Sequence, residues 1–485
     1  MGLRRMEQKR GLLEKLRDYK KSDYYPYHMP GHKRRQLGKL PEDLLGLDIT
    51  EIDGFDNLHQ AEGILQRLQD EANELYQAEE TFYLINGSTG GILSAVSTVL
   101  PEGGHLLMAR NSHKSVYHAA YLRKLRITYL YPARVQGFDF YEAVTAEQVE
   151  QALNQEPDIG AVLIVSPTYE GRIADVREIA QVVHKKGIPL IVDEAHGAHL
   201  GFAKGFSPGS CTEGADLVIH SVHKTLPALT QTALLHVNGS LVDRERLRRF
   251  LHIYQTSSPS YLLMASIEDA LKIAGQERER FDRFLIWYQQ MLTHLQGCRV
   301  LRFVPWQDVE QGRQDIGKLV IVTDKAGVSG QWLYDELREK YHLQCEMSAG
   351  TYCLAMFTLA DDKEAYTRMV RALIQIDSEL AEKLPLLPEM DTRPERIFST
   401  PNIAYSLAEA WDMPCKMTRL SDAINCPVAE FINLYPPGIP LLVPGEVMTE
   451  ELYGEIVEDR MQGLNIQGIV EQEGNCFVKK IITGD

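Results

Sequence analysis

The sequence lacks the paired cysteines that cross-link secreted domains or bind zinc. Its seven cysteines are scattered along 485 residues, and no Cys-x-x-Cys pair occurs. An odd, scattered set of this kind is typical of a protein kept in a reducing compartment. We therefore expect the protein to be cytoplasmic.

Long hydrophobic runs are lacking as well. No segment reaches eighteen uninterrupted apolar residues, which is roughly what a helix needs to span a bilayer. The first residues, MGLRRMEQKRGLLEKLRDYKK, contain no apolar stretch like that of a signal peptide, and Met6 stands where N-myristoylation requires Ser or Thr. We expect no membrane partner.

The sequence contains fewer basic residues than acidic ones. The sequence has 51 Lys and Arg against 67 Asp and Glu, a formal net charge of −16. A surface of this sign repels the phosphates of nucleic acids, so we expect no nucleic-acid partner. Apolar residues make up 44% of the chain, enough for a large core, and 485 residues exceed what one core usually holds.

Strand-like apolar runs alternate with helical stretches between about residues 60 and 240. The runs lie at 105–109, 161–166, 188–193, 215–220 and 233–237. Continuous Val, Ile and Leu are typical of mostly parallel strands buried on both faces, which predicts an α/β doubly wound large domain. In such sheets the functional residues gather just beyond the carboxyl ends of the strands.

Changes in composition and in the pattern of apolar residues along the sequence suggest four regions. A short amphipathic helix near 6–20 is expected to dock on the body or on another subunit. Apolar runs at 318–324 and 351–359 indicate a smaller α/β domain, and a proline-rich linker at 383–395 precedes a C-terminal unit. The expected regions are an N-terminal arm (1–45), a large domain (46–285), a small α/β domain (286–385) and a C-terminal α+β domain (386–485).

Two of the strand ends place an acid and an amine side by side. Asp193 ends the run 188–193, and Lys224 follows the run 215–220 in Ser-Val-His-Lys. Neighbouring parallel strands would bring both groups to one edge of the sheet, where pyridoxal 5'-phosphate (PLP) needs a lysine amine and an acid against its pyridine nitrogen. A turn-capping Asp and a solvated Lys are the plainer alternatives.

Two further stretches fit the same cofactor. Asn86-Gly-Ser-Thr-Gly-Gly91 precedes a helical run, and glycines that open a helix let backbone N–H groups reach a phosphate, although a plain helix cap has the same composition. No Walker A lysine follows, which excludes a nucleotide loop. His113 follows the run 105–109 and could lie flat on a ring or serve as a structural histidine.

Two rival site types remain open at this point. Gly205-Phe-Ser-Pro-Gly209 matches the Gly-x-Ser-x-Gly pattern of serine hydrolases, but no buried strand precedes it. Asp193, His196 and His199 could form the metal cluster of a metal-dependent hydrolase, although no His-Glu-x-x-His helix supports that interpretation. We expect no metal.

A set of motifs in a characteristic order resembles the fold-type-I Orn/Lys/Arg decarboxylases of bacteria. The resemblance covers nearly the whole chain and is closest to the short form, which lacks an N-terminal response-regulator-like domain. The motifs are HMPGHK (28–33), NGSTGG (86–91), SHKS (112–115), SPTYEG (166–171), VDEAHGAH (192–199), HSVHK (220–224), TSSPSYLLMAS (256–266) and YPPGIPLLVPGE (435–446).

This resemblance implies a PLP site and assigns roles in it. Lys224 would carry the internal aldimine, Asp193 would pair with the pyridine nitrogen, and His113 would stack on the ring. His196 would contact the cofactor from the side of Asp193. The residues implied around the phosphate are Ser88, Thr89, Gly90, Ser221 and His223.

The resemblance also implies an assembly and a substrate subsite. Thr256 matches a position that reaches the phosphate of the neighbouring subunit, which implies a homodimer with shared active sites and leaves larger oligomers open. Glu430 matches an acidic residue near the substrate entrance. The chain departs from relatives that place Gly-Arg before this glutamate, because Asn425-Cys-Pro-Val428 stands here.

The implied reaction is the decarboxylation of arginine, lysine or ornithine to CO₂ and an amine of the polyamine pathway. Its catalytic residues would be Lys224, His223, Asp193 and His113, with Lys224 or His223 reprotonating the α-carbon. An aminotransferase or an aldolase-type lyase is the nearer alternative, since the same lysine and aspartate serve all of these enzymes.

Overall fold

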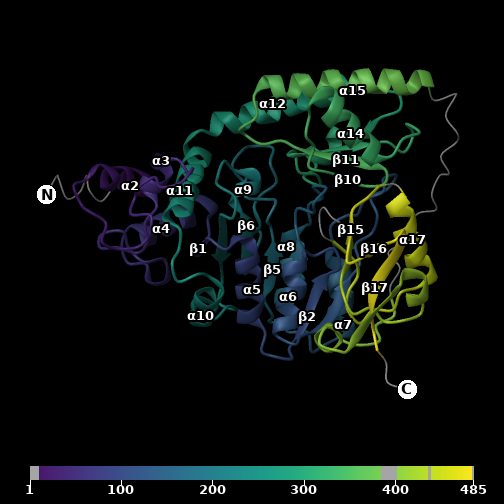
Figure 1. Cartoon of the computed structure of the whole chain (residues 1–485), viewed down its shortest axis with the longest axis horizontal. Coiled ribbons are helices and arrows are strands. Elements are labelled where there is room, and N and C mark those ends of the chain that lie inside the picture. The colour runs from purple at the N-terminus through teal and green to yellow at the C-terminus, as the bar shows by residue number, and fades with distance from the viewer. Residues whose placement is uncertain (1–9, 384–400, 435–438, 462, 483–485) are drawn as a thin grey trace. The chain divides into compact units, whose positions relative to one another are not determined.

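A computed structural model describes residues 10–383, 401–434, 439–461 and 463–482 (Figure 1). The chain divides into two compact units. Unit 1 comprises the residues up to 99 together with 176–282, and unit 2 comprises 100–175 and 283–485. Within the described ranges, no helix combines the length and the apolar character that crossing a bilayer requires.

The sheet of unit 1 brings together the strands that carry the acid and the amine. Its order is β1-β7-β6-β5. The strands are β1 (Glu80–Leu84), β5 (Leu190–Asp193), β6 (Leu217–Ser221) and β7 (Ala233–Val237). β5 and β6 run parallel, with Asp193 opposite Ile219, so their carboxyl ends lie at the same edge.

One strand of unit 1 departs from the expected parallel arrangement. β7 pairs antiparallel with both β6 and β1. The connection between β6 and β7 spans only residues 222–232, and parallel strands need a crossover of a dozen residues or more. The run 233–237 is therefore the antiparallel exception among the mostly parallel strands that the sequence predicted.

Helices cover the strands of unit 1. They are α2 (Leu12–Lys21), α3 (Glu42–Leu47), α4 (Ile64–Tyr76), α5 (Gly87–Val99), α8 (Val176–His184), α9 (Val222–Thr225), α10 (Arg244–Tyr254) and α11 (Tyr261–Gln276). The expected N-terminal helix is α2, which packs on α11 and buries Leu12 and Leu16. The Glu268 carboxylate of α11 accepts the Leu12 N–H at 2.7 Å, which fixes the first turn. The helix therefore docks on the body, as one of the two expected arrangements predicted.

Unit 2 contains three parallel strands in the order β4-β2-β3. They are β2 (His105–Ala109), β3 (Arg126–Leu130) and β4 (Ala161–Val165), with helices α6 (Lys114–Leu122) and α7 (Ala146–Gln155) between them. β2 is buried along its whole length. The apolar runs at 105–109 and 161–166 therefore form the predicted strands.

A second sheet of unit 2 has the order β10-β11-β9-β8, with every pairing antiparallel. It consists of β8 (Arg302–Phe303), β9 (Lys318–Val322), β10 (Met347–Ser348) and β11 (Tyr352–Met356), with α13 (Trp306–Glu310), α14 (Gly330–Tyr341) and α15 (Lys363–Lys383). α12 (Arg278–Leu295) runs without a break through residue 285. The expected domain boundaries stay predictions.

The C-terminal part of unit 2 holds two small antiparallel sheets, β12-β17-β16 and β14-β13-β15. Its elements are α16 (Leu407–Ala410), β12 (Cys415–Arg419), β13 (Ile432–Leu434), β14 (Ile439–Leu442), α17 (Glu450–Met461), β15 (Ile466–Gln467), β16 (Val470–Gln472) and β17 (Asn475–Ile481). Val428, Leu442 and Met448 belong to their shared core. Most of the expected linker, from residue 384, and residues 435–438 of the last motif lie outside the described residues.

Candidate active site

The carboxyl ends of β5 and β6 carry the predicted acid and amine. Asp193 is the last residue of β5, and Ser221 is the last residue of β6. The one-turn helix α9 follows directly and carries His223 and Lys224. The structure therefore brings the key residues of unit 1 to one edge of its sheet, as the sequence predicted.

Lys224 is half-buried and bonded to a histidine. Its Nζ atom lies 3.0 Å from Nε2 of His196, whose side chain is buried. A solvated surface lysine would not hold this geometry, because its amine would be hydrated. Its partial burial and its bond to His196 favour a site residue over a solvated surface lysine.

Asp193 is a buried carboxylate next to this amine. It accepts the N–H of Ala195 at 3.2 Å. Burial raises the pKa of Asp193, while the positive charge of Lys224 and the Ala195 N–H act in the opposite direction. Burial penalises an ionised carboxylate, so a cationic group placed against Asp193 would stabilise its charge.

Two serines meet where α5 begins. The hydroxyl of Ser221 donates to the hydroxyl of Ser88 at 2.9 Å. Gly91 lets α5 pack closely against β1, because a Cβ atom at this position would lie 2.7 Å from the side chain of Leu84, the last residue of β1. Thr89 is exposed on the same first turn, and the N–H of Gly90 bonds to the Asn86 carbonyl at 3.4 Å. Hydroxyls at a helix N-terminus form a setting suited to a phosphate.

His223 is held as a neutral imidazole. Its Nδ1 atom lies 2.9 Å from the carbonyl oxygen of Thr232, which can only accept, so Nδ1 carries the proton and Nε2 keeps its lone pair. Burial lowers the pKa of His223, the hydrogen bond to Thr232 opposes this, and the charge of Lys224 lowers the pKa further. His223 can therefore accept a proton at Nε2.

Thr256 lies on the exposed segment between α10 and α11. Its carbonyl oxygen lies 2.8 Å from Nε2 of His59, and its hydroxyl accepts the N–H of Ser258 at 3.3 Å. The side chain is open to solvent. Thr256 is therefore accessible on unit 1, and its role toward a second subunit stays a prediction.

His113 and Glu430 belong to unit 2. His113 caps α6, with Nδ1 accepting the Ser115 N–H at 3.2 Å. Glu430 precedes β13, and its carboxylate accepts from the Phe431 N–H at 3.1 Å and from Lys479 Nζ at 3.4 Å. The stacking role of His113 and the substrate role of Glu430 stay predictions.

The structure does not support the serine-hydrolase alternative. Ser207 lies in a loop that begins at Gly205 (φ +102°) and leads into a short 3-10 helix, Ser210–Thr212. A nucleophile elbow requires a strand before the serine and a long helix after it. The Gly-x-Ser-x-Gly match is a loop sequence.

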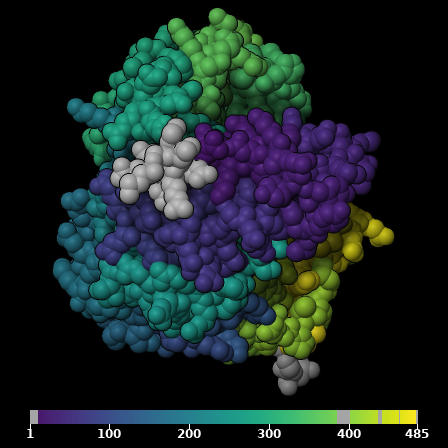
Figure 2. Space-filling view, turned by 90° about the vertical axis from the view of Figure 1, so that its left-hand side faces the viewer, coloured from purple at the N-terminus to yellow at the C-terminus, as the bar shows by residue number. Residues whose placement is uncertain are grey.

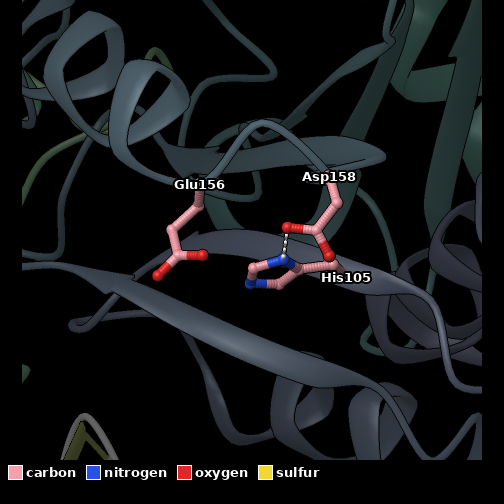
Figure 3. A group of neighbouring side chains, drawn as sticks. All are labelled: His105, Glu156 and Asp158. Carbon is pink, nitrogen blue, oxygen red and sulfur yellow. Dashed lines mark hydrogen bonds and ion pairs between the residues drawn. The ribbon is translucent and has the colours of Figure 1, made fainter.

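The structure does not form the metal cluster considered above from Asp193, His196 and His199. In the part of the chain that the structure describes, one group has metal-ligand spacing, namely His105, Glu156 and Asp158 (Figure 3). Arg126 donates to the Asp158 carboxylate and lies 2.6 Å from Nδ1 of His105. A guanidinium among the ligands supplies the positive charge that a metal would bring, so this group is an ion-pair cluster.

Sequence reasoning missed three buried polar residues next to the site: Glu194, His220 and His236. The first two lie within motifs quoted above, but neither received a role. A detectable signal exists, because His236 interrupts an apolar run, His220 ends one and Glu194 directly follows one.

Comparisons with known proteins identify the family of the chain. The family model described as "Orn/Lys/Arg decarboxylase, major domain" matches residues 11–307. Arginine decarboxylase of Bacillus subtilis is 30% identical over 91% of this chain and 92% of its own length, and that of Halalkalibacterium halodurans is 30% identical over 91% of both. The crystal structure of the Francisella novicida lysine decarboxylase LdcF shares the fold, with a TM-score of 0.81 over 97% of this chain and 81% of its own, at 18% identity.

Proposed function

Because the chain belongs to the Orn/Lys/Arg decarboxylase family, we propose that it removes the α-carboxylate of a basic amino acid as CO₂, with PLP held at Lys224. The observation that carries this proposal is the meeting of Lys224, His196 and Asp193 at the carboxyl ends of β5 and β6.

The residues present fit PLP. The buried Asp193 carboxylate suits a protonated pyridine nitrogen, because burial leaves it in need of a cation. Ser88 and Ser221, at the start of α5, suit the phosphate. When bound, PLP supplies the electron sink that stabilises the electron pair left on the α-carbon as CO₂ departs.

Side chains of the protein attach the cofactor, orient it and transfer the proton. Lys224 attaches the cofactor and His196 orients its amine. The bond between the α-carbon and the carboxylate breaks, and one proton must then reach the α-carbon. Lys224 delivers it from its ammonium group, or His223 delivers it after its Nε2 atom has first taken up a proton. His113 would stack on the ring, as the family resemblance implies.

We propose arginine as the preferred substrate. Support comes from the two relatives above, which are arginine decarboxylases at 30% identity over most of both chains. Glu430 is an acidic group suited to the cationic end of the side chain, since a carboxylate pairs well with a guanidinium.

Release of labelled CO₂ from arginine, lysine and ornithine, assayed separately, tests both reaction and substrate. We expect arginine to give the largest kcat/KM. Equal or greater turnover of lysine would overturn the choice of arginine. A keto acid in place of CO₂ would favour the aminotransferase alternative.

Borohydride treatment tests the role of Lys224. The protein with PLP should absorb near the visible edge, lose that band on reduction, and yield a cofactor-labelled peptide that contains Lys224. Lys224→Ala should bind no PLP covalently and release no CO₂. Ser207→Ala is the matched control and should retain both properties.

We propose that the protein works as a homodimer. Support comes from an exposed apolar segment at residues 24–44, part of the purple N-terminal surface in Figure 2. Its most exposed side chains are Tyr24, Tyr27, Met29, Leu37 and Leu40, and a monomer would leave all of them in water. Sedimentation should give a dimer for the wild type and a monomer for Tyr27→Ser/Leu37→Ser, and a wild-type monomer would contradict this.

The cysteines support a reducing compartment, and we propose the cytoplasm. All seven are unpaired thiols, and Cys211, Cys345 and Cys353 are buried. Fractionation of the native cells tests this placement, which predicts the protein in the cytoplasmic fraction.

A further inference from the structure

A chain of hydrogen bonds runs through the interior of unit 1, from β1 to the end of β5. The Thr81 hydroxyl lies 2.8 Å from Nδ1 of His236, and Nε2 of His236 lies 3.0 Å from Nδ1 of His220. Nε2 of His220 lies 2.7 Å from the Glu194 carboxylate. All four side chains are at most 1% exposed, so the chain is sealed from water.

Glu194 anchors this chain at its far end. Its carboxylate accepts the hydroxyl of Ser210 at 2.6 Å and the N–H of Ser210 at 3.1 Å, in addition to His220. A carboxylate can only accept, so Nε2 of His220 carries the proton of their shared bond. Both carboxylate oxygens are therefore occupied, which fixes the orientation of Glu194.

The two imidazoles complete the chain without an unpaired group. Burial lowers the pKa of His236 well below its usual value, and the neighbouring His220 lowers it further, so His236 is neutral. A neutral His220 with its proton on Nε2 accepts at Nδ1, so His236 donates from Nε2 and accepts the Thr81 hydroxyl at Nδ1. The ring of Tyr76 packs against both imidazoles, with centroids 4.8 Å and 4.6 Å away.

The position of this chain connects it to the cofactor site. Glu194 directly follows Asp193, and His220 directly precedes Ser221. The last paired residues of the β5–β6 ladder are Asp193 and Ile219, so the Glu194–His220 bond joins the two strands just beyond the ladder. The two strand ends that carry Asp193, Ser221 and Lys224 are thereby held together.

We propose that Glu194 and His220 are positioning residues for the cofactor site, which hold the ends of β5 and β6 so that Asp193, Ser221 and Lys224 address one cofactor. This inference rests on the proposed function, since it takes the cofactor to be PLP. Groups that orient metal ligands without touching the metal typically change affinity or activity by about 10–100-fold, and we expect an effect of similar size on PLP binding here.

The same two strands offer a matched control at their amino ends. Nε2 of His184 lies 2.8 Å from the Asp216 carboxylate, which also accepts the N–H of Leu190 at 2.8 Å. His184 ends α8 and Asp216 directly precedes β6, so these bonds hold the amino ends of β5 and β6 to each other and to α8, at the opposite ends of the strands from Lys224. Their loss should destabilise the sheet without moving the site.

The experiment compares Glu194→Gln and His220→Gln with Asp216→Asn and His184→Gln. Each full-length apoprotein is titrated with PLP, and the Kd, the absorption band of the bound cofactor and the midpoint of thermal unfolding are measured. We expect the first two variants to weaken PLP binding by about tenfold or more and to shift the absorption band. The two controls should lower only the unfolding midpoint.

Further variants separate positioning from simple stability. Glu194→Asp keeps the carboxylate and should recover part of the lost PLP affinity. The double variant Glu194→Gln/His220→Gln should be no worse than either single variant, because the two residues act as one pair. If Glu194→Gln or His220→Gln fails to fold, Thr81→Val and His236→Gln interrupt the same chain further from the site and should weaken PLP binding in the same direction.

The outcomes are distinct. A Kd and an absorption band equal to those of the wild type in the folded Glu194 and His220 variants would overturn the positioning role. A wild-type protein that takes up no PLP at Lys224 would instead overturn the proposed function.

Discussion

At the scale of single residues, the proton position of His223 follows from its contact with one backbone carbonyl. The Thr232 carbonyl holds the proton of His223 on Nδ1, and burial with the charge of Lys224 keeps the ring neutral. The contact with Thr232 is not visible in the motif HSVHK, because Thr232 lies eight residues beyond Lys224, just before β7.

His223→Gln tests whether this imidazole moves a proton. We expect kcat to fall by about 10²–10⁴-fold, the usual contribution of a positioned acid or base, while the cofactor absorption band persists. Steady-state kinetics and an absorption spectrum of the same sample measure both. An unchanged kcat would leave Lys224 as the group that reprotonates the α-carbon.

His236 should make the protein sensitive to acid. Its folded pKa is depressed by burial and by His220, whereas in the unfolded chain it titrates near 6.5. As the pH falls below 6.5 the unfolded state takes up a proton that the folded state refuses, so stability falls by about 1.4 kcal/mol per pH unit until the folded pKa is reached. Thermal unfolding between pH 7 and pH 5 should show a flatter pH dependence for His236→Gln than for the wild type.

At the scale of elements, the attachment of α2 depends on one buried carboxylate. Glu268 of α11 accepts the N–H groups of Leu12 and Leu13, two of the first donors of α2, and pairs with Lys272. The first N–H groups of a helix have no partner inside it, so a side chain from elsewhere must supply one. The helix was predictable from its spacing of leucines, but its partner was not.

Glu268→Ala should loosen α2 from the body. We expect a cost of about 1–3 kcal/mol, because the buried N–H of Leu12 loses its acceptor. Limited proteolysis should cut the segment around α2 sooner in this variant. Lys272→Ala, which removes the exposed partner of Glu268 and keeps its carboxylate, should be cut at the wild-type rate, and equal rates for all three proteins would exclude the role of Glu268.

At the scale of the whole molecule, unit 2 joins distant parts of the chain through a buried ion pair. Arg110 follows β2, and Glu446 lies 336 residues later, with 3.0 Å between their charged groups and only 2% of either side chain exposed. Burial raises the pKa of Glu446, and Arg110 opposes that shift. The pair therefore links the segment before His113 to the C-terminal sheets.

Glu446→Ala should be costly, since it leaves a guanidinium buried without its partner. We expect a loss of about 3–5 kcal/mol, seen as a lower midpoint of thermal unfolding. Glu339→Ala removes an exposed partner of Arg338 and should leave the unfolding midpoint close to that of the wild type. Similar midpoints for the two variants would show that Arg110 finds another partner.

The sequence by itself determined the strand runs at 105–109, 161–166 and 233–237, and it placed Asp193 and Lys224 at neighbouring strand ends. These features are local, because apolar runs and residues just after them follow from adjacent positions in the chain. The resemblance carried by the motifs then pointed to the family that the comparisons identify.

Tertiary structure alone decided the direction of β7, the bond between Lys224 and His196, and the chain from Thr81 to Glu194. Each depends on groups brought together by folding from separate strands or turns. A buried polar group needs a partner, but the sequence does not say which of several distant partners will lie within 3 Å. The cofactor chemistry was thus readable from local motifs, whereas the network proposed to position it was not.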